Sequence, residues 1–158
     1  MFRISGRMTG PIMVLALGLG ACSPHLAKGV DEAALDAALT RGIGDPNTCV
    51  LVGKASTGQV LHRYGAYTVC ARPWPVCSGP ELKTALDRLR GAGETHASCA
   101  STADGARQVA WSMGPVEGQP GLAYVAVMEG PNTPPGIVIT ERIKSAFRRA
   151  GRSPVPAP

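Results

Sequence analysis

Apolar residues recur at helical spacing in two segments, one early in the chain and one near its end. Residues 31–39 begin with Asp31, a residue type that caps helix N-termini, and carry leucines and alanines on one side. Residues 137–150 have apolar side chains every three or four positions and stop at Gly151. Both segments are predicted to be amphipathic helices with one face on a core.

A third helix is predicted in the middle of the chain. Ser78 and Glu81 have the spacing of a capping box, and Pro80 lies in the first turn, where a proline loses no hydrogen bond. The apolar stripe that follows at helical spacing consists of Leu82, Ala85, Leu86 and Leu89. This helix is expected to end at Gly91.

Stretches rich in β-branched and aromatic residues predict strands after the first helix. Residues 49–54 and 59–64 flank a turn at residues 56–58, so they are expected to form a hairpin. The chain is then expected to continue as a further extended piece over residues 66–71. The prolines within residues 73–80 argue against regular structure there.

Two further strands are predicted in the second half of the chain. Residues 107–113 alternate apolar and polar side chains, and residues 122–129 are almost wholly apolar, which is typical of a central strand covered on both faces. Residues 91–105 are polar and are expected to form a long loop. The order of elements predicts one small α+β domain over residues 31–151, with an antiparallel sheet of about four to five strands flanked by two to three helices.

The N-terminus has the organisation of a secretory signal. Arg3 and Arg7 precede an apolar stretch of about fourteen residues, which is shorter than the ~20 residues that a membrane-spanning helix needs. The stretch ends in Leu19-Gly20-Ala21-Cys22, which resembles the bacterial lipobox. The resemblance implies that diacylglycerol is attached to the Cys22 thiol and that cleavage makes Cys22 the first residue of the mature protein. The alternative is a plain secretory signal with Cys22 as an incidental free thiol.

This resemblance sets the expected organisation and location of the protein. Residues 1–21 are the expected lipoprotein signal peptide, residues 22–30 a tether, and residues 152–158 a proline-rich flexible tail. In lipoproteins of this kind, a residue other than aspartate after the acylated cysteine, here Ser23, usually directs the protein to the outer membrane. We therefore expect a protein that is anchored through acyl chains such as palmitate and that faces the periplasm.

Positive charge is mild and gathers near the C-terminus. Loss of residues 1–21 lowers the formal net charge from +5 to +3, and residues 141–152 carry five of the remaining cations. This run is expected to be the solvated face of the last helix, with anionic lipid headgroups or an acidic partner as alternatives. Nucleic acid is not an expected partner, because an exported lipoprotein rarely meets it.

Four cysteines remain once Cys22 is assigned to lipid, namely Cys49, Cys70, Cys77 and Cys99. An oxidising compartment pairs them as two disulfides, and three pairings are open. We favour Cys49 with Cys70 and Cys77 with Cys99, because each pair closes a loop of about twenty residues, which the chain-entropy model values at ~3 kcal/mol. Structural zinc sites present thiols in closer pairs, so no metal and no cofactor is expected.

Motifs for catalysis are weak in this sequence. Ser112 lies in a stretch similar to a nucleophile elbow, but no histidine follows His96. Residues 50–65 and 108–131 resemble the first hairpin and the last strands of the penicillin-recognising serine hydrolases. That family needs Ser-x-x-Lys, which is missing here, and residues 83–85 read K-T-A in place of its K-T-G. The resemblance therefore implies the sheet of the family without its catalytic machinery.

Together these observations predict a lipid-anchored envelope protein with a non-catalytic binding or structural role. The expected partner contact combines the polar loop 91–105 with the loop that consists of Pro73, Trp74 and Pro75. Trp74 is either an exposed docking aromatic or a cover for the core, and the core is the favoured role. One alternative is a divergent cell-wall serine hydrolase that uses Ser78 near Lys83. Another is a periplasmic domain that binds a small molecule.

Overall fold

We describe a computed structural model of the chain, which defines residue 26 and residues 30–151. Within this part, the main sheet consists of β1 (Thr48–Lys54), β2 (Val60–Gly65), β5 (Thr95–Ala100), β6 (Gln108–Pro115) and β7 (Leu122–Gly130). Two short strands, β3 (Trp74–Pro75) and β4 (Leu82–Lys83), form a separate hairpin. The helices are α1 (Glu32–Ile43), α2 (Tyr67–Ala71), α3 (Ala85–Leu89) and α4 (Gly136–Ala150).

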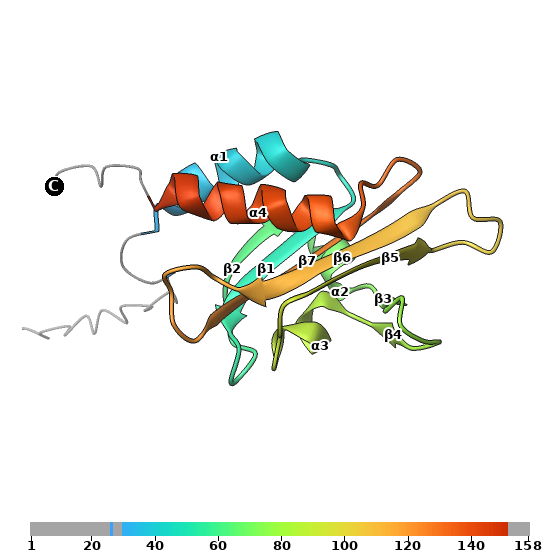
Figure 1. The fold of residues 1–158 in the computed structure, drawn as a ribbon, viewed down its shortest axis with the longest axis horizontal. Helices are drawn as coiled ribbons and strands as arrows, with labels where there is room; N and C mark the ends of the chain where they lie inside the picture. The colour runs from blue at the N-terminus through green and yellow to red at the C-terminus, as the bar shows by residue number, and fades with distance from the viewer. Residues whose placement is uncertain (1–25, 27–29, 152–158) are drawn as a thin grey trace, which may run out of the picture.

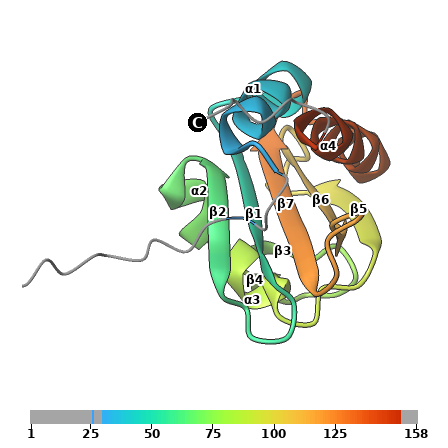
Figure 2. The same ribbon diagram turned by 90° about the vertical axis from the view of Figure 1, so that its left-hand side faces the viewer.

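The main sheet lies between two helical layers. Its strands follow the order β2-β1-β7-β6-β5, and every neighbouring pair is antiparallel. Helices α1 and α4 lie side by side on one face, and the short helices α2 and α3 lie on the opposite face (Figures 1 and 2). The predicted α+β class and the antiparallel sheet are confirmed. The described residues contain four helices instead of two to three, because two short helices cover the second face.

Strand β7 is the centre of the core. All nine of its residues are buried, which confirms the prediction of a central strand covered on both faces. On one face, Leu39 and Ile143 from the long helices pack against the sheet. On the other face, Leu89 and Trp111 belong to a second apolar cluster. Burial of one such large apolar side chain contributes roughly 1.5–3 kcal/mol, so both helical layers are held mainly by apolar contact.

Local sequence signals place several elements close to their predicted positions. The Asp31 side chain accepts a hydrogen bond from the Ala34 N–H at 3.1 Å, which confirms the predicted cap of α1. The hairpin β1–β2 lies within one residue of its predicted bounds at each end, and α4 matches residues 137–150 closely. Helix α1 continues to Ile43, beyond the predicted end at residue 39.

The predicted start of the middle helix is wrong. Helix α3 begins at Ala85, where the Thr84 hydroxyl accepts the N–H of Asp87 and the Asp87 carboxylate accepts the N–H of Thr84. The capping spacing of Ser78 and Glu81 instead lies in the β3–β4 turn, since the Val76 N–H donates to the Glu81 carbonyl and closes a hairpin. The predicted stripe is consequently split. Leu82 and Leu86 are exposed, whereas Ala85 and Leu89 are buried.

Two further predictions are corrected between β2 and β6. Residues 66–71 are not extended: they form the turn of helix α2, which brings Cys70 back beside Cys49 on β1. Residues 91–105 are not one loop, because β5 pairs with β6 inside this stretch. Strand β5 is an edge strand. Ser98 contacts α4 on one face and Cys99 bonds to Cys77 on the other, but most residues of β5 are exposed, so its sequence shows no clear hydrophobic period.

The predicted signal peptide (1–21), the lipidation site Cys22, most of the tether (22–30) and the tail (152–158) lie outside the described residues. Leu26 is described, is buried in the cluster beneath α1 and α4, and donates its N–H to the Glu32 carboxylate at 3.1 Å. Within the described residues, no helix combines the length and the apolar character needed to cross a membrane.

Candidate anion-binding cavity around Arg88

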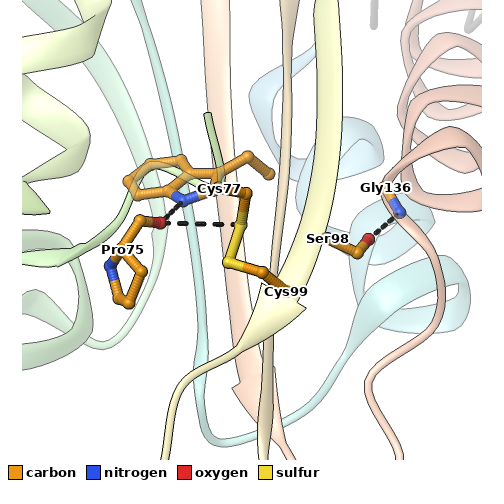
Figure 3. Close-up of a disulfide and its surroundings, with 6 residues drawn as sticks. Pro75, Cys77, Ser98, Cys99 and Gly136 are labelled. Carbon is orange, nitrogen blue, oxygen red and sulfur yellow. Dashed lines mark hydrogen bonds between the residues drawn. A yellow bond between two sulfur atoms is a disulfide. The ribbon is translucent and has the colours of Figure 1, made fainter. Parts of the chain in front are cut away.

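Two disulfides fix the layer that carries α2, α3 and the β3–β4 hairpin. Cys49 pairs with Cys70 and Cys77 pairs with Cys99, which is the pairing that the loop lengths favoured. The first bond joins β1 to α2 and is buried. The second joins the β3–β4 turn to the edge strand β5 and is partly exposed (Figure 3). The turn is thereby held against the sheet by a covalent bond, with a Cα–Cα distance of 5.4 Å.

Both tryptophans of the chain belong to the apolar cluster between this layer and the sheet. The Trp74 ring is only 4% exposed, and its Nε1–H donates to the Val69 carbonyl at 2.9 Å. Trp74 therefore covers the core, and only Pro73 of the predicted contact loop is fully at the surface, while Pro75 is half-buried. The Trp111 Nε1–H donates to the Pro75 carbonyl at 2.6 Å, so Trp111 fixes the hairpin from beneath. An exposed docking aromatic at Trp74 is thus wrong, because its indole is buried and hydrogen-bonded.

A cavity of about 320 Å³ opens between α3, the β3–β4 turn and the start of β5. Residues on its polar side include Ser78, Lys83 and Arg88, and Val76 and Met113 provide apolar wall. Val76 and Ser78 flank Cys77 in the sequence, so the Cys77–Cys99 disulfide holds one wall of the cavity in place.

Arg88 is the most unusual side chain of this cavity. Its guanidinium lies over the Trp111 ring, with the central carbon 4.6 Å from the ring centroid. The Nη1 atom is buried, and the side chain forms no hydrogen bond or ion pair with any residue that the structure describes. Burial lowers the pKa of the Arg88 guanidinium, and no acidic neighbour opposes that shift. A half-buried cation without a counter-ion is unfavourable, so an anionic group placed beside it would be strongly attracted.

The other charges around the cavity are already engaged. The Lys83 ammonium pairs with the Glu81 carboxylate at 3.0 Å. Hydrogen bonds from the Thr84 backbone N–H and hydroxyl hold the pKa of Asp87 below its usual value, so this carboxylate caps α3 and does not compensate Arg88. Arg90 donates to the Thr57 carbonyl at 3.1 Å. Among the described residues that line the cavity, Arg88 is therefore the cation that has neither an ion pair nor a hydrogen-bond acceptor.

The structure places the candidate catalytic residues at separate sites, with only Ser78 and Lys83 at the same one. Ser78 and Lys83 both line the Arg88 cavity. Ser112 is fully buried on the opposite face of the sheet, where its hydroxyl lies 2.8 Å from the Thr140 hydroxyl and 3.2 Å from the Tyr124 hydroxyl. This hydrogen-bonded position within the core gives Ser112 a structural role. His96 is exposed and lies on β5, not in a loop.

Sequence reasoning missed Arg88, because its chemistry depends on a distant residue. An arginine on a short amphipathic helix is typical of a solvated face, and the ring that covers Arg88 comes from Trp111, 23 positions away in the sequence. In the described segments, no group of three or more His, Cys, Asp or Glu side chains is arranged to hold a metal ion. Comparison of the chain with protein-family models, with curated proteins and with solved structures found no match.

Proposed function

We propose that this chain is a lipid-anchored cell-envelope protein that binds a carboxylate-bearing ligand in the Arg88 cavity and performs no chemistry on it. The observation that carries the binding role is the half-buried Arg88 guanidinium without a counter-ion. The two donor groups of one guanidinium fork match the two oxygens of a carboxylate. Val76 and Met113 beside it favour a ligand that also has an apolar body.

The proposed location rests on the N-terminal sequence and is compatible with the disulfides. Leu19-Gly20-Ala21-Cys22 provides a lipobox-like site, and two or three acyl chains on Cys22 would hold the protein on a membrane essentially permanently. Two disulfides in a chain of this size are typical of an oxidising compartment such as the periplasm. We place the protein on the periplasm-facing side of the outer membrane. A Cys22→Ser variant that still fractionates as an acylated protein would contradict this location.

The binding role is tested with benzoate, a small apolar carboxylate, added to the whole purified chain. Because Arg88 lies on the Trp111 ring, occupation of the cavity should produce a saturable change in tryptophan fluorescence. Arg88→Met removes the charge and keeps an unbranched side chain, so it should abolish the change. Arg72→Met is the matched control, since Arg72 lies over the other tryptophan, Trp74, at 4.4 Å and does not line this cavity.

Two results would overturn the binding proposal. One is a linear or absent fluorescence response in the unmodified protein, and the other is an equal loss of response in Arg72→Met and Arg88→Met. Circular dichroism establishes that each variant is folded. Arg88→Met removes both the cost of a half-buried charge and its contact with the Trp111 ring, and these effects oppose one another, so the urea midpoint should change little.

A second candidate function has one observation in its favour. Ser78 and Lys83, which the hydrolase alternative requires, line the same cavity. The Lys83 ammonium is directed to the Glu81 carboxylate, 3.0 Å away, and not to the Ser78 hydroxyl, which does not favour this alternative. Covalent labelling by a fluorescent β-lactam that disappears in Ser78→Ala would replace the binding role with this catalytic one.

A further inference from the structure

A second charged site lies on the opposite face of the sheet, between the two long helices. A groove of about 370 Å³ runs where α1 and α4 lie side by side (Figure 2). Arg41 from α1 and Arg142 and Arg149 from α4 line it, together with the Ser145 hydroxyl. None of the described residues that line it is acidic. Three arginines therefore share one groove without a carboxylate in its described lining.

These arginines differ from the neighbouring cations of α4. Lys144 pairs with Glu94 at 2.6 Å, and Arg148 lies 3.8 Å from Glu117. By contrast, the three groove arginines form no ion pair within the part of the chain that the structure describes, and their single hydrogen bond joins Arg142 Nη1 to the Gly42 carbonyl at 3.0 Å.

Favourable interaction with the helix dipole accounts for only part of this arrangement. Arg41 and Arg149 lie in the last turns of their helices, where a cation is stabilised by the C-terminal carbonyl groups. Arg142 lies in the middle of α4, but its Nη1 donates to the Gly42 carbonyl in the last turn of α1, so a helix C-terminus accounts for one of its donor groups. These helix-end contacts leave further donor groups of the three arginines unused along one groove between two helices, which is the arrangement of an anion site.

We propose that the groove between α1 and α4 binds a phosphate group. A carboxylate offers two oxygens and is satisfied by one guanidinium, whereas a phosphate presents more acceptor oxygens and suits several forks at once. The Ser145 hydroxyl is a further donor at the same place. The site is independent of the Arg88 cavity, because the sheet separates the two.

Two sources of phosphate are chemically possible, a lipid headgroup and a free phosphate. The position of the chain favours the headgroup, in a step that rests on the proposed anchor. Cys22 precedes the buried Leu26 by four residues, and four residues span at most about 14 Å. An acylated Cys22 would therefore hold the α1–α4 layer close to the membrane surface, where anionic headgroups attract basic clusters.

The experiment titrates the whole purified chain, at low ionic strength, by isothermal titration calorimetry. The probes are dihexanoyl phosphatidylglycerol, dihexanoyl phosphatidylcholine and inorganic phosphate, which are all soluble and need no membrane anchor. Arg41→Gln/Arg149→Gln should weaken binding of the anionic lipid about 25-fold, if each arginine contributes about fivefold. Arg148→Gln is the matched control on the same helix and should change binding less than about twofold, since an exposed pair contributes little.

Each outcome decides one part of the proposal. Tighter binding of phosphatidylglycerol than of inorganic phosphate assigns the site to a headgroup, and equal binding assigns it to a free phosphate. Absence of binding by both anions overturns the proposal. So does equal binding of zwitterionic phosphatidylcholine, or a loss in Arg148→Gln as large as in the double variant. Arg88→Met should bind these probes normally, so failure here is distinguishable from failure of the proposed carboxylate site.

Discussion

Loss of the Cys77–Cys99 disulfide should destabilise the protein less than loss of the Cys49–Cys70 disulfide. The two bonds close loops of nearly equal length, with sequence separations of 22 and 21 residues. The chain-entropy model therefore gives each of them about 3 kcal/mol. Any difference between the two variants must come from what the replaced side chains contact in the folded protein.

Burial supplies this difference. Cys49 is completely buried and Cys70 is 4% exposed, whereas Cys77 and Cys99 are both partly exposed. A serine hydroxyl buried without a partner costs about 1–3 kcal/mol, and a hydroxyl that reaches water costs little. We expect about 3 kcal/mol for Cys77→Ser/Cys99→Ser and about 5 kcal/mol or more for Cys49→Ser/Cys70→Ser. Since domains are stable by roughly 5–15 kcal/mol, the first variant should stay folded and the second should be marginal.

Urea unfolding measures both values through tryptophan fluorescence, because Trp74 and Trp111 are buried in the folded protein. The unmodified protein in reductant is the reference for loss of both bonds. Equal free energies of unfolding for the two double variants, or a larger loss for Cys77→Ser/Cys99→Ser, would refute the argument from burial. The partly exposed bond should also be the first that a mild reductant opens, as alkylation and mass spectrometry would report.

Three further predictions concern single contacts. The Glu129 carboxylate accepts two hydrogen bonds from Arg107, at 2.7 and 2.6 Å, which hold the pKa of Glu129 below its usual value. The ion pair therefore contributes fully to the free energy of unfolding above about pH 4.3, and this contribution is lost as the pH falls through the folded-state pKa. Glu129→Gln should lower the free energy of unfolding by about 2 kcal/mol at pH 7. In the variant, the urea midpoint should also fall less steeply as the pH is lowered, and an unchanged fall at low pH would count against this ion pair. Gly136→Ala should cost about 2 kcal/mol in thermal unfolding, because a Cβ atom there would lie 2.8 Å from the Ala97 carbonyl oxygen and displace α4 from the sheet; an unchanged Tm would contradict that close approach. Thr84→Ala removes the cap of α3 and should cost about 1 kcal/mol in urea, while a loss below about 0.3 kcal/mol would mean that the cap does not stabilise the helix.

The fold could be predicted where one segment contains its own signal. Asp31 precedes a clear apolar stripe, and β7 is apolar throughout, so neither depends on distant residues. Helix α2 could not be predicted, because its β-branched and aromatic residues favour a strand and the Cys49–Cys70 bond holds the helical turn in place. Strand β5 was hidden for a similar reason, since its pairing with β6 outweighs its polar composition.

The candidate sites show the same division between local and distant signals. Spacing favoured the observed disulfide pairing among three open ones, because each bond closes a loop of about twenty residues. The Arg88 site depends on an arginine and a tryptophan from different elements, and the phosphate groove depends on α1 and α4, which are separated by most of the chain. No local pattern distinguishes Arg88 or Arg142 from an arginine on a solvated helix face. Burial of the guanidinium distinguishes Arg88, and for Arg142 the distinguishing feature is the missing acidic partner among the described residues.

The two proposed sites have a geometric consequence when they are taken together. Helices α1 and α4 cover one face of the sheet, and α3 with Arg88 lies on the opposite face (Figure 1). An anchor at Cys22 and a headgroup in the groove would both hold the α1–α4 face against the membrane. The Arg88 cavity would then open away from the lipid surface, toward the periplasm. Protein reconstituted in vesicles that contain phosphatidylglycerol should therefore respond to benzoate as the detergent-solubilised protein does. A response that is lost on reconstitution would mean that the Arg88 face, and not the α1–α4 face, contacts the membrane.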